Sequence, residues 1–107
     1  LKNIHLKLEN EFKNIVIITL EEYGSFTKIG NEYKLIPSMK VNTVDSSGAG
    51  DIFHGALLYF MLMNYSIEDS IKLSNICGAL ATTRLGNKDF NFPLTKILKY
   101  GGVNDII

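Results

Sequence analysis

The chain has 107 residues, and its 11 basic and 11 acidic side chains give a formal net charge of zero. That length suffices for one modest domain with a core, and the absent positive charge argues against a nucleic-acid partner. A single cysteine, Cys77, excludes an internal disulfide and a multi-cysteine zinc site, and it fits a cytoplasmic protein. The most apolar run, residues 56–63, is far shorter than the ~20 residues that cross a bilayer, so no membrane partner is expected. Because the chain starts at Leu1 without a recognisable domain start, we expect a fragment of a longer polypeptide.

The first two predicted elements are a helix and a strand. Residues 1–12 carry apolar side chains at Ile4, Leu8 and Phe12, a weak helical stripe. Residues 14–20 read Asn-Ile-Val-Ile-Ile-Thr-Leu, a β-branched run without alternation. Such a run predicts a strand covered on both faces, as in a parallel α/β sheet.

Two short strands, residues 25–29 and 32–36, are predicted next. Gly30-Asn31 between them is a two-residue hairpin signal, and Pro37 ends the second strand. Two tyrosines, Tyr23 and Tyr33, are expected to pack within the hairpin.

Three helices are predicted in the second half of the chain. Residues 50–63 are apolar nearly all round, which predicts a buried helix. Ser66 with Asp69 is a capping-box variant that begins a second helix, which is expected to run to about Leu85 and to end at Gly86. Cys77 falls on the apolar face of that helix and is expected to be inert core. A last short helix is predicted over residues 94–100.

Residues 45–53, Asp-Ser-Ser-Gly-Ala-Gly-Asp-Ile-Phe, are the most informative stretch of the chain. Free N–H groups at a helix start bind anions, and the two glycines let a phosphate approach the backbone. Since a lone carboxylate there would repel phosphate, Asp51 suggests a base that deprotonates an attacking hydroxyl. The same residues also fit a tight strand-to-helix turn in which Asp51 only complements the helix dipole, an interaction of ~0.3–1 kcal/mol. The residues by themselves leave both interpretations open.

Two common nucleotide motifs are excluded. The chain has no G-x-x-x-x-G-K-[ST], so it has no P-loop, and Phe53 stands where a dinucleotide-binding motif would need glycine.

Residues 44–57 closely resemble the second signature of the ribokinase-like (PfkB) carbohydrate kinases, D-[TS]-x-G-A-G-D-x-F. Residues 15–20 with Gly24 are similar to the family's strand and T-L-G-x-x-G nucleotide turn. Residues 75–86 are similar to the helix that closes its adenine pocket. The resemblance implies an α/β protein and assigns residues 1–107 to the C-terminal, nucleotide-binding part of a ribokinase-like fold. Family members are roughly three times longer, and most of their sugar-binding residues lie N-terminal to this region.

The resemblance also implies roles for single residues. Asp51 matches the general base, and the N–H groups of Gly48, Ala49 and Gly50 match the anion hole for the transferring phosphoryl group of ATP. Nucleotide-binding positions are Thr19, Gly24 and Asn75, the last in the adenine site. Mg²⁺ would bridge the phosphates. Several members bind a potassium ion, chiefly through carbonyl oxygens, at positions that match Asp45, Ser47, Ala81, Arg84, Gly86 and Phe90. The alternative for that set is a helix end followed by a surface loop.

The implied activity is ATP-dependent phosphorylation of a sugar or sugar-phosphate hydroxyl, and a homodimer is compatible with the resemblance. Two alternatives stay open: a nucleoside kinase of the same superfamily, and a non-catalytic nucleotide-binding fragment or pseudokinase. Glu21 stands where the family usually has glycine, and its acid could repel ATP phosphates. His54 could contact substrate, but a place on the helix surface is the more ordinary expectation. We expect the fragment alone to be inactive, because the residues that orient the acceptor are not in it.

Overall fold

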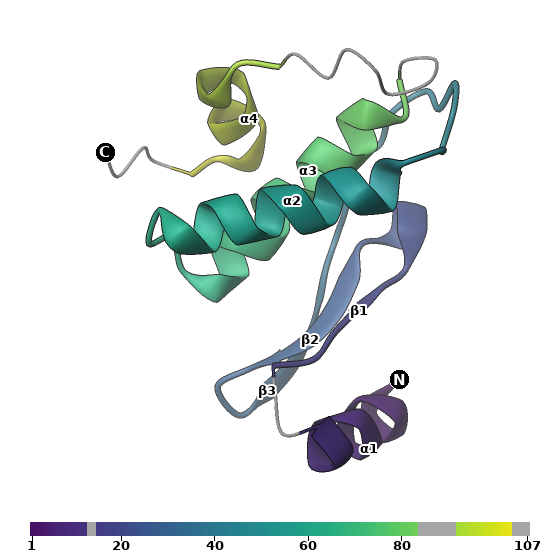
Figure 1. Ribbon diagram of the computed structural model, residues 1–107, viewed down its shortest axis with the longest axis vertical. Helices are drawn as coiled ribbons and strands as arrows, with labels where there is room; N and C mark the ends of the chain where they lie inside the picture. The colour runs from purple at the N-terminus through teal and green to yellow at the C-terminus, as the bar shows by residue number, and fades with distance from the viewer. Residues whose placement is uncertain (13–14, 84–91, 104–107) are drawn as a thin grey trace.

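The computed structural model describes residues 1–12, 15–83 and 92–103 (Figure 1). Its elements in chain order are α1 (Lys2–Phe12), β1 (Ile17–Thr19), the 3₁₀ helix η1 (Glu21–Tyr23), β2 (Ser25–Ile29), β3 (Glu32–Ile36), α2 (Ala49–Leu62), α3 (Ile67–Ala81) and α4 (Leu94–Gly101). Three candidate cation residues, Arg84, Gly86 and Phe90, lie outside the described residues.

The strands form one antiparallel sheet in the order β1-β2-β3. The predicted hairpin is confirmed: Ile29 pairs with Glu32 across the turn, and Gly30 takes a φ of 61° that suits glycine. The prediction for residues 14–20 needs correction, because β1 spans only Ile17–Thr19 and pairs antiparallel with β2. Its isoleucines are half-buried rather than covered on both faces. A β-branched run carries no information on strand direction, which the return of the chain through η1 decides here.

Helix α1 is confirmed, but its buried face is not the predicted one. Ile4 is 56% exposed, whereas His5 is 1% exposed. The His5 imidazole lies edge-on to the rings of Phe26 and Tyr33, and its Nε2 lies 2.8 Å from the Val16 carbonyl oxygen. The helix therefore docks on the sheet through the aromatic cluster around His5. A search for apolar residues along the helix misses this contact, because histidine is polar.

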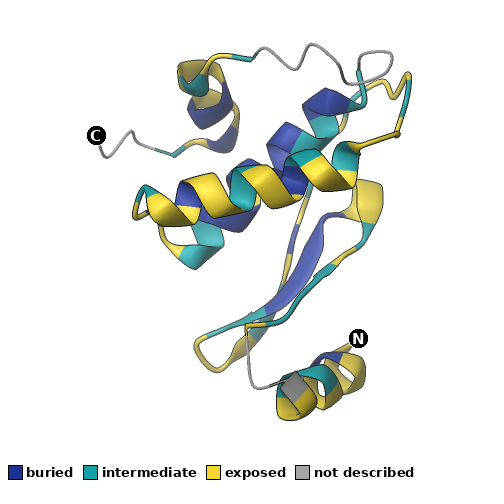
Figure 2. Ribbon diagram, viewed as in Figure 1, coloured by how far each residue is buried: buried dark blue, intermediate teal, exposed yellow. Residues whose placement is uncertain are grey.

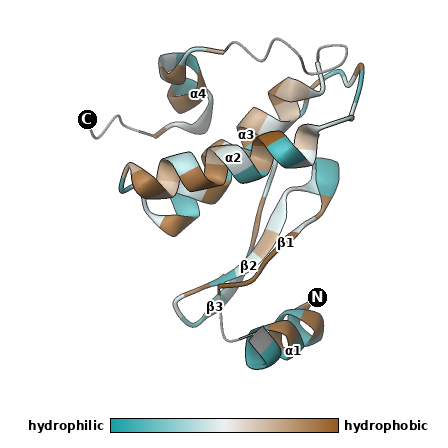
Figure 3. Cartoon of the chain, in the orientation of Figure 1, coloured by the Kyte–Doolittle hydropathy of each residue, from teal (hydrophilic) through white to brown (hydrophobic). Residues whose placement is uncertain are grey.

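Helix α2 agrees with its prediction in extent but not in burial. Only Phe53 and Phe60 are fully buried, and Figure 2 shows alternating exposed positions along the helix. Leu58 and Leu62 are 62% and 71% exposed. The hydropathy colouring of Figure 3 places strongly apolar residues on this helix, so an apolar face is left open. The reason is that α3 covers one side of α2, and no other described element packs extensively on it.

Helix α3 begins as predicted and ends earlier. The Ser66 hydroxyl accepts the Asp69 N–H at 3.1 Å, which confirms the cap. The helix ends at Ala81 rather than near residue 85. The hydroxyls of Thr82 and Thr83 donate to the Ala79 and Leu80 carbonyls, both at 2.6 Å, and these local bonds compete with continuation of the helix.

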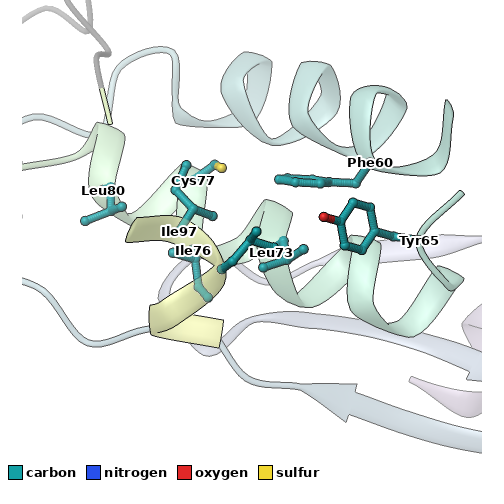
Figure 4. Packing of buried hydrophobic residues seen from close by; sticks show 8 residues of the cluster. Phe60, Tyr65, Leu73, Ile76, Cys77, Leu80 and Ile97 are labelled. Atoms are coloured by element: carbon teal, nitrogen blue, oxygen red, sulfur yellow. The ribbon is translucent and has the colours of Figure 1, made fainter. Parts of the chain in front are cut away.

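The main core lies between α2, α3 and α4, with α3 at its centre (Figure 4). Its buried members are Phe60, Tyr65, Leu73, Ile76, Cys77, Leu80, Ile97 and Leu98. The expectation that Cys77 is core is confirmed, and burial raises the pKa of its thiol to about 11. Helix α4 ends at Gly101, followed by Gly102 with a φ of 63°. Among the described residues, no helix has the length and apolarity needed to span a membrane.

Candidate functional site

The glycine turn leads into α2 through a left-handed residue. Gly48 is the N-cap of α2 with φ 76° and ψ 0°, a conformation that glycine adopts without steric cost. No side chain caps this helix start. The Ala49 N–H donates to the Ser46 carbonyl at 3.3 Å, and the helix dipole is positive at this end. A Cβ built on Gly50 would meet no atom within 4 Å, so the surface above the turn is open.

Asp51 is the third residue of α2 and is exposed to solvent. Its carboxylate makes no hydrogen bond or ion pair with the described residues. His54, one turn further on, is also exposed, and its Nδ1 lies 2.7 Å from the Gly50 carbonyl oxygen. His54 thus contacts its own helix, as expected for a surface position, while Asp51 is free to act on a bound molecule.

The segment before the glycine turn is tied to the end of α3. The N–H groups of Val44 and Asp45 both donate to the Thr82 carbonyl oxygen, at 2.7 and 3.0 Å. The Asp45 carboxylate in turn accepts the Ser47 N–H at 2.9 Å. Two candidate cation residues, Asp45 and Ser47, are thereby brought to the end of the helix that finishes with Ala81.

The turn between β1 and β2, which the sequence predicts to bind nucleotide, is closed by backbone hydrogen bonds. The Leu20 N–H donates to the Gly24 carbonyl at 2.8 Å, and the Gly24 N–H donates to the Glu21 carbonyl at 3.2 Å. Gly24 has a φ of 110°, and a Cβ there would lie 2.1 Å from the Ile36 carbonyl oxygen. No residue larger than glycine fits this position without moving backbone. Thr19, the last residue of β1, is exposed beside the turn.

Glu21 has a left-handed backbone conformation. Its φ is 52°, in the left-handed region that costs an L-residue ~1–2 kcal/mol. Its side chain is exposed. The turn therefore forms with glutamate in place, at the expense of local strain.

Asn75 is buried at 6% exposure in the middle of α3. Its Oδ1 accepts the Ser25 hydroxyl at 2.7 Å, and its Nδ2 donates to the Ile36 carbonyl at 2.9 Å. Gly24 and Asn75, two of the predicted nucleotide positions, thus meet at one carbonyl group. Ser25 and Thr82 were not singled out by the sequence pattern. The sequence signals that could have found them are position alone: Ser25 directly follows Gly24, and Thr82 follows the end of the apolar helix.

The two tyrosines differ in environment. Tyr33 stacks on Phe26 with ring centroids 5.8 Å apart, which confirms packing within the hairpin. Tyr23 is 69% exposed at the end of η1.

Comparison with known proteins places this geometry in context. A family model described as pfkB family carbohydrate kinase matches residues 1–93. The chain is 36% identical over 76 residues to a ribokinase of Lactococcus lactis, covering 71% of this chain and 25% of that protein. It is 34% identical over 91 residues to fructokinase-1 of Zea mays, covering 78% of this chain and 28% of that protein. The chain therefore spans only about a quarter of the length of these relatives.

A solved structure of comparable fold is the fructokinase of Vibrio cholerae O395 in a form with bound fructose, ADP and calcium ion. Its TM-score is 0.76 at 29% identity, covering 89% of this chain and 33% of that structure. This likeness confirms that the chain has the fold of part of a ribokinase-like α/β protein.

Proposed function

The chain belongs to the pfkB family of carbohydrate kinases, and we propose that the polypeptide containing it transfers the γ-phosphoryl group of ATP to a hydroxyl group of a sugar. The observation that carries the proposal is the start of α2. Three features meet there within residues 48–51. They are a helix N-terminus without a side-chain cap, an open glycine turn, and the exposed carboxylate of Asp51. That carboxylate makes no hydrogen bond or ion pair with the described residues.

In the proposed reaction Asp51 accepts the proton of the acceptor hydroxyl. The oxygen then bonds to the γ-phosphorus, the bond from that phosphorus to the bridging oxygen breaks, and ADP leaves. The N–H groups of Gly48, Ala49 and Gly50 would stabilise the negative charge on the transferring group. This arrangement supplies positioning and charge stabilisation, on which phosphoryl transfer mostly depends.

The second wall of the site would hold the nucleotide. We assign it to Thr19, Gly24 and Asn75, because the turn after β1 and the middle of α3 converge at the Ile36 carbonyl. A matched structure from E. coli, described as a ribokinase II, was solved with ATP and Mg²⁺. Mg²⁺ would neutralise phosphate charge here, and the open surface above Gly50 leaves space for the phosphates.

A monovalent cation site is proposed at the end of α3. The Asp45 N–H donates to the Thr82 carbonyl, next to Ala81, and the Ser47 N–H donates to the Asp45 carboxylate. The remaining proposed ligands are Arg84, Gly86 and Phe90. A variant of the Vibrio fructokinase was solved with potassium ion, which supports testing K⁺ first.

The experiment uses the full-length polypeptide with Mg-ATP and follows ADP release against ribose, fructose, deoxyribose and inosine. Sugar-dependent release supports the proposal. Release with inosine alone would support the nucleoside-kinase alternative instead. ADP binding without turnover on any acceptor would favour a non-catalytic nucleotide-binding protein. Sedimentation of the same preparation would test whether it forms a homodimer, and omission of K⁺ would test the cation site.

A further inference from the structure

Ser25 lies where the two elements of the proposed nucleotide wall meet. It follows Gly24 directly, is the first residue of β2 and is 0% exposed. Its hydroxyl donates to Oδ1 of Asn75 at 2.7 Å, joining the start of β2 to the middle of α3.

The orientation of the Asn75 amide follows from its neighbours. The carbonyl oxygens of Ile36 and Pro37 lie 2.9 and 3.5 Å from Nδ2, and carbonyl oxygens can only accept hydrogen bonds. The NH₂ group must therefore face them, and Oδ1 must face Ser25. Both amide N–H groups are then directed at protein carbonyls, which leaves neither for a nucleotide base.

The same network braces the chain that follows β3. The Ser38 hydroxyl donates to the Asn75 backbone carbonyl at 3.3 Å. The Ile36 carbonyl oxygen that accepts from Asn75 is also the atom that a Cβ on Gly24 would meet first. Without the Ser25 hydroxyl, the buried Oδ1 would lose its donor and the amide could rotate away from Ile36.

We propose that Ser25 is a positioning residue of the nucleotide wall, holding the Asn75 amide so that Asn75 braces residues 36–38 against Gly24 instead of donating to the base. This inference rests on the proposed function, because it assigns Ser25 to the ATP site of a kinase.

The test compares Ser25→Ala with Ser74→Ala in the full-length polypeptide. Ser74 is a matched control: it is also 0% exposed and neighbours Asn75, but its hydroxyl donates to the Ser70 carbonyl within α3, at 2.6 Å. We expect Ser25→Ala to weaken ADP binding and raise KM for ATP by about 3- to 10-fold, the effect of one buried hydrogen bond. KM for the sugar should not change. Ser74→Ala should lower Tm as Ser25→Ala does, yet leave ADP affinity as in the wild type.

A second variant and a spectroscopic readout cover the case in which Ser25→Ala does not fold. Ser25→Cys is slightly larger and keeps a weak S–H donor, and it should show a smaller rise in the same Kd for ADP. The Asn75 side-chain amide protons should exchange slowly with solvent in wild type and Ser74→Ala, and faster in Ser25→Cys.

The outcomes distinguish failure of the role of Ser25 from failure of the proposed kinase function. Equal ADP affinity in the Ser25 and Ser74 variants, or unchanged affinity in Ser25→Cys, would overturn the role of Ser25 while the kinase proposal stands. Wild-type protein that binds no ADP would overturn both.

Discussion

The backbone N–H of Asp45 donates to the carbonyl oxygen of Thr82 at 3.0 Å, joining the segment before the glycine turn to the residue after α3. The same helix holds the hairpin through the Asn75 amide. Helix α3 is therefore the element that sets the glycine turn and the proposed nucleotide wall relative to each other. Its buried position in the core suits that task, because close-packed interiors have low compressibility and transmit strain between the elements that they join.

Replacing Asp51 with asparagine should abolish most turnover. Asp51→Asn keeps size and hydrogen bonding but removes the basic carboxylate, so kcat in the full-length polypeptide should fall ~10²–10⁴-fold with ADP affinity largely kept. Asp69→Asn is the matched control, since Asp69 is likewise the third residue of a helix. Near-normal turnover in Asp51→Asn would refute the assignment.

The two glycines of the turn should separate stability from activity. Gly48 is left-handed, so Gly48→Ala should lower the free energy of unfolding by ~1–2 kcal/mol. Gly50 has no positive φ, so its replacement should cause no backbone strain. Gly50→Ala should gain up to ~1 kcal/mol of helix propensity while its methyl group obstructs the phosphate. Denaturant unfolding and ATP turnover measured on both variants check this, and full activity in Gly50→Ala would show that phosphate does not contact the turn.

Glu21→Gly should stabilise the protein and strengthen ATP binding. The substitution relieves a left-handed glutamate worth ~1–2 kcal/mol and costs ~0.5–1 kcal/mol in chain entropy, a net gain of up to about 1.5 kcal/mol. It also removes an acid from the proposed phosphate side of the nucleotide turn. Glu22→Gly is the control. Because Glu22 has no positive φ, this substitution relieves no strain and should only destabilise the protein. A raised KM for ATP in Glu21→Gly would indicate that the glutamate assists nucleotide binding.

Stability should fall in alkali through Cys77. Burial raises its thiol pKa from 9.0 to about 11, so the folded protein keeps a proton that the unfolded chain releases. The stability that the protonated Cys77 thiol contributes is complete below pH 9 and declines as pH rises from 9.0 to about 11. The difference in unfolding free energy between wild type and Cys77→Ala should therefore shrink over that window, while other titrating groups cancel. A constant difference from pH 8 to 11 would contradict the burial of the thiol.

The 107-residue chain alone should not phosphorylate sugars. It spans about a quarter of its relatives' length, and α2 exposes apolar residues such as Leu58 and Leu62. Loss of acceptor orientation can forfeit ~7–11 kcal/mol of barrier lowering. ADP release from purified residues 1–107 should match an Asp51→Asn control with every sugar tested.

Local signals were enough to predict several features. The hairpin follows from Gly30-Asn31, the start of α3 from Ser66 and Asp69, and the family from the signature around Gly48 and Asp51, because turns, caps and short motifs depend on neighbouring residues. Tertiary structure alone decided the rest. The burial of His5 and the bond between Ser25 and Asn75 join residues distant in sequence. The exposed apolar face of α2 depends on which elements pack against it, and the direction of β1 depends on the return of the chain through η1. Hydrophobic patterns record which side chains favour burial, whereas the partner that buries each one is decided by packing.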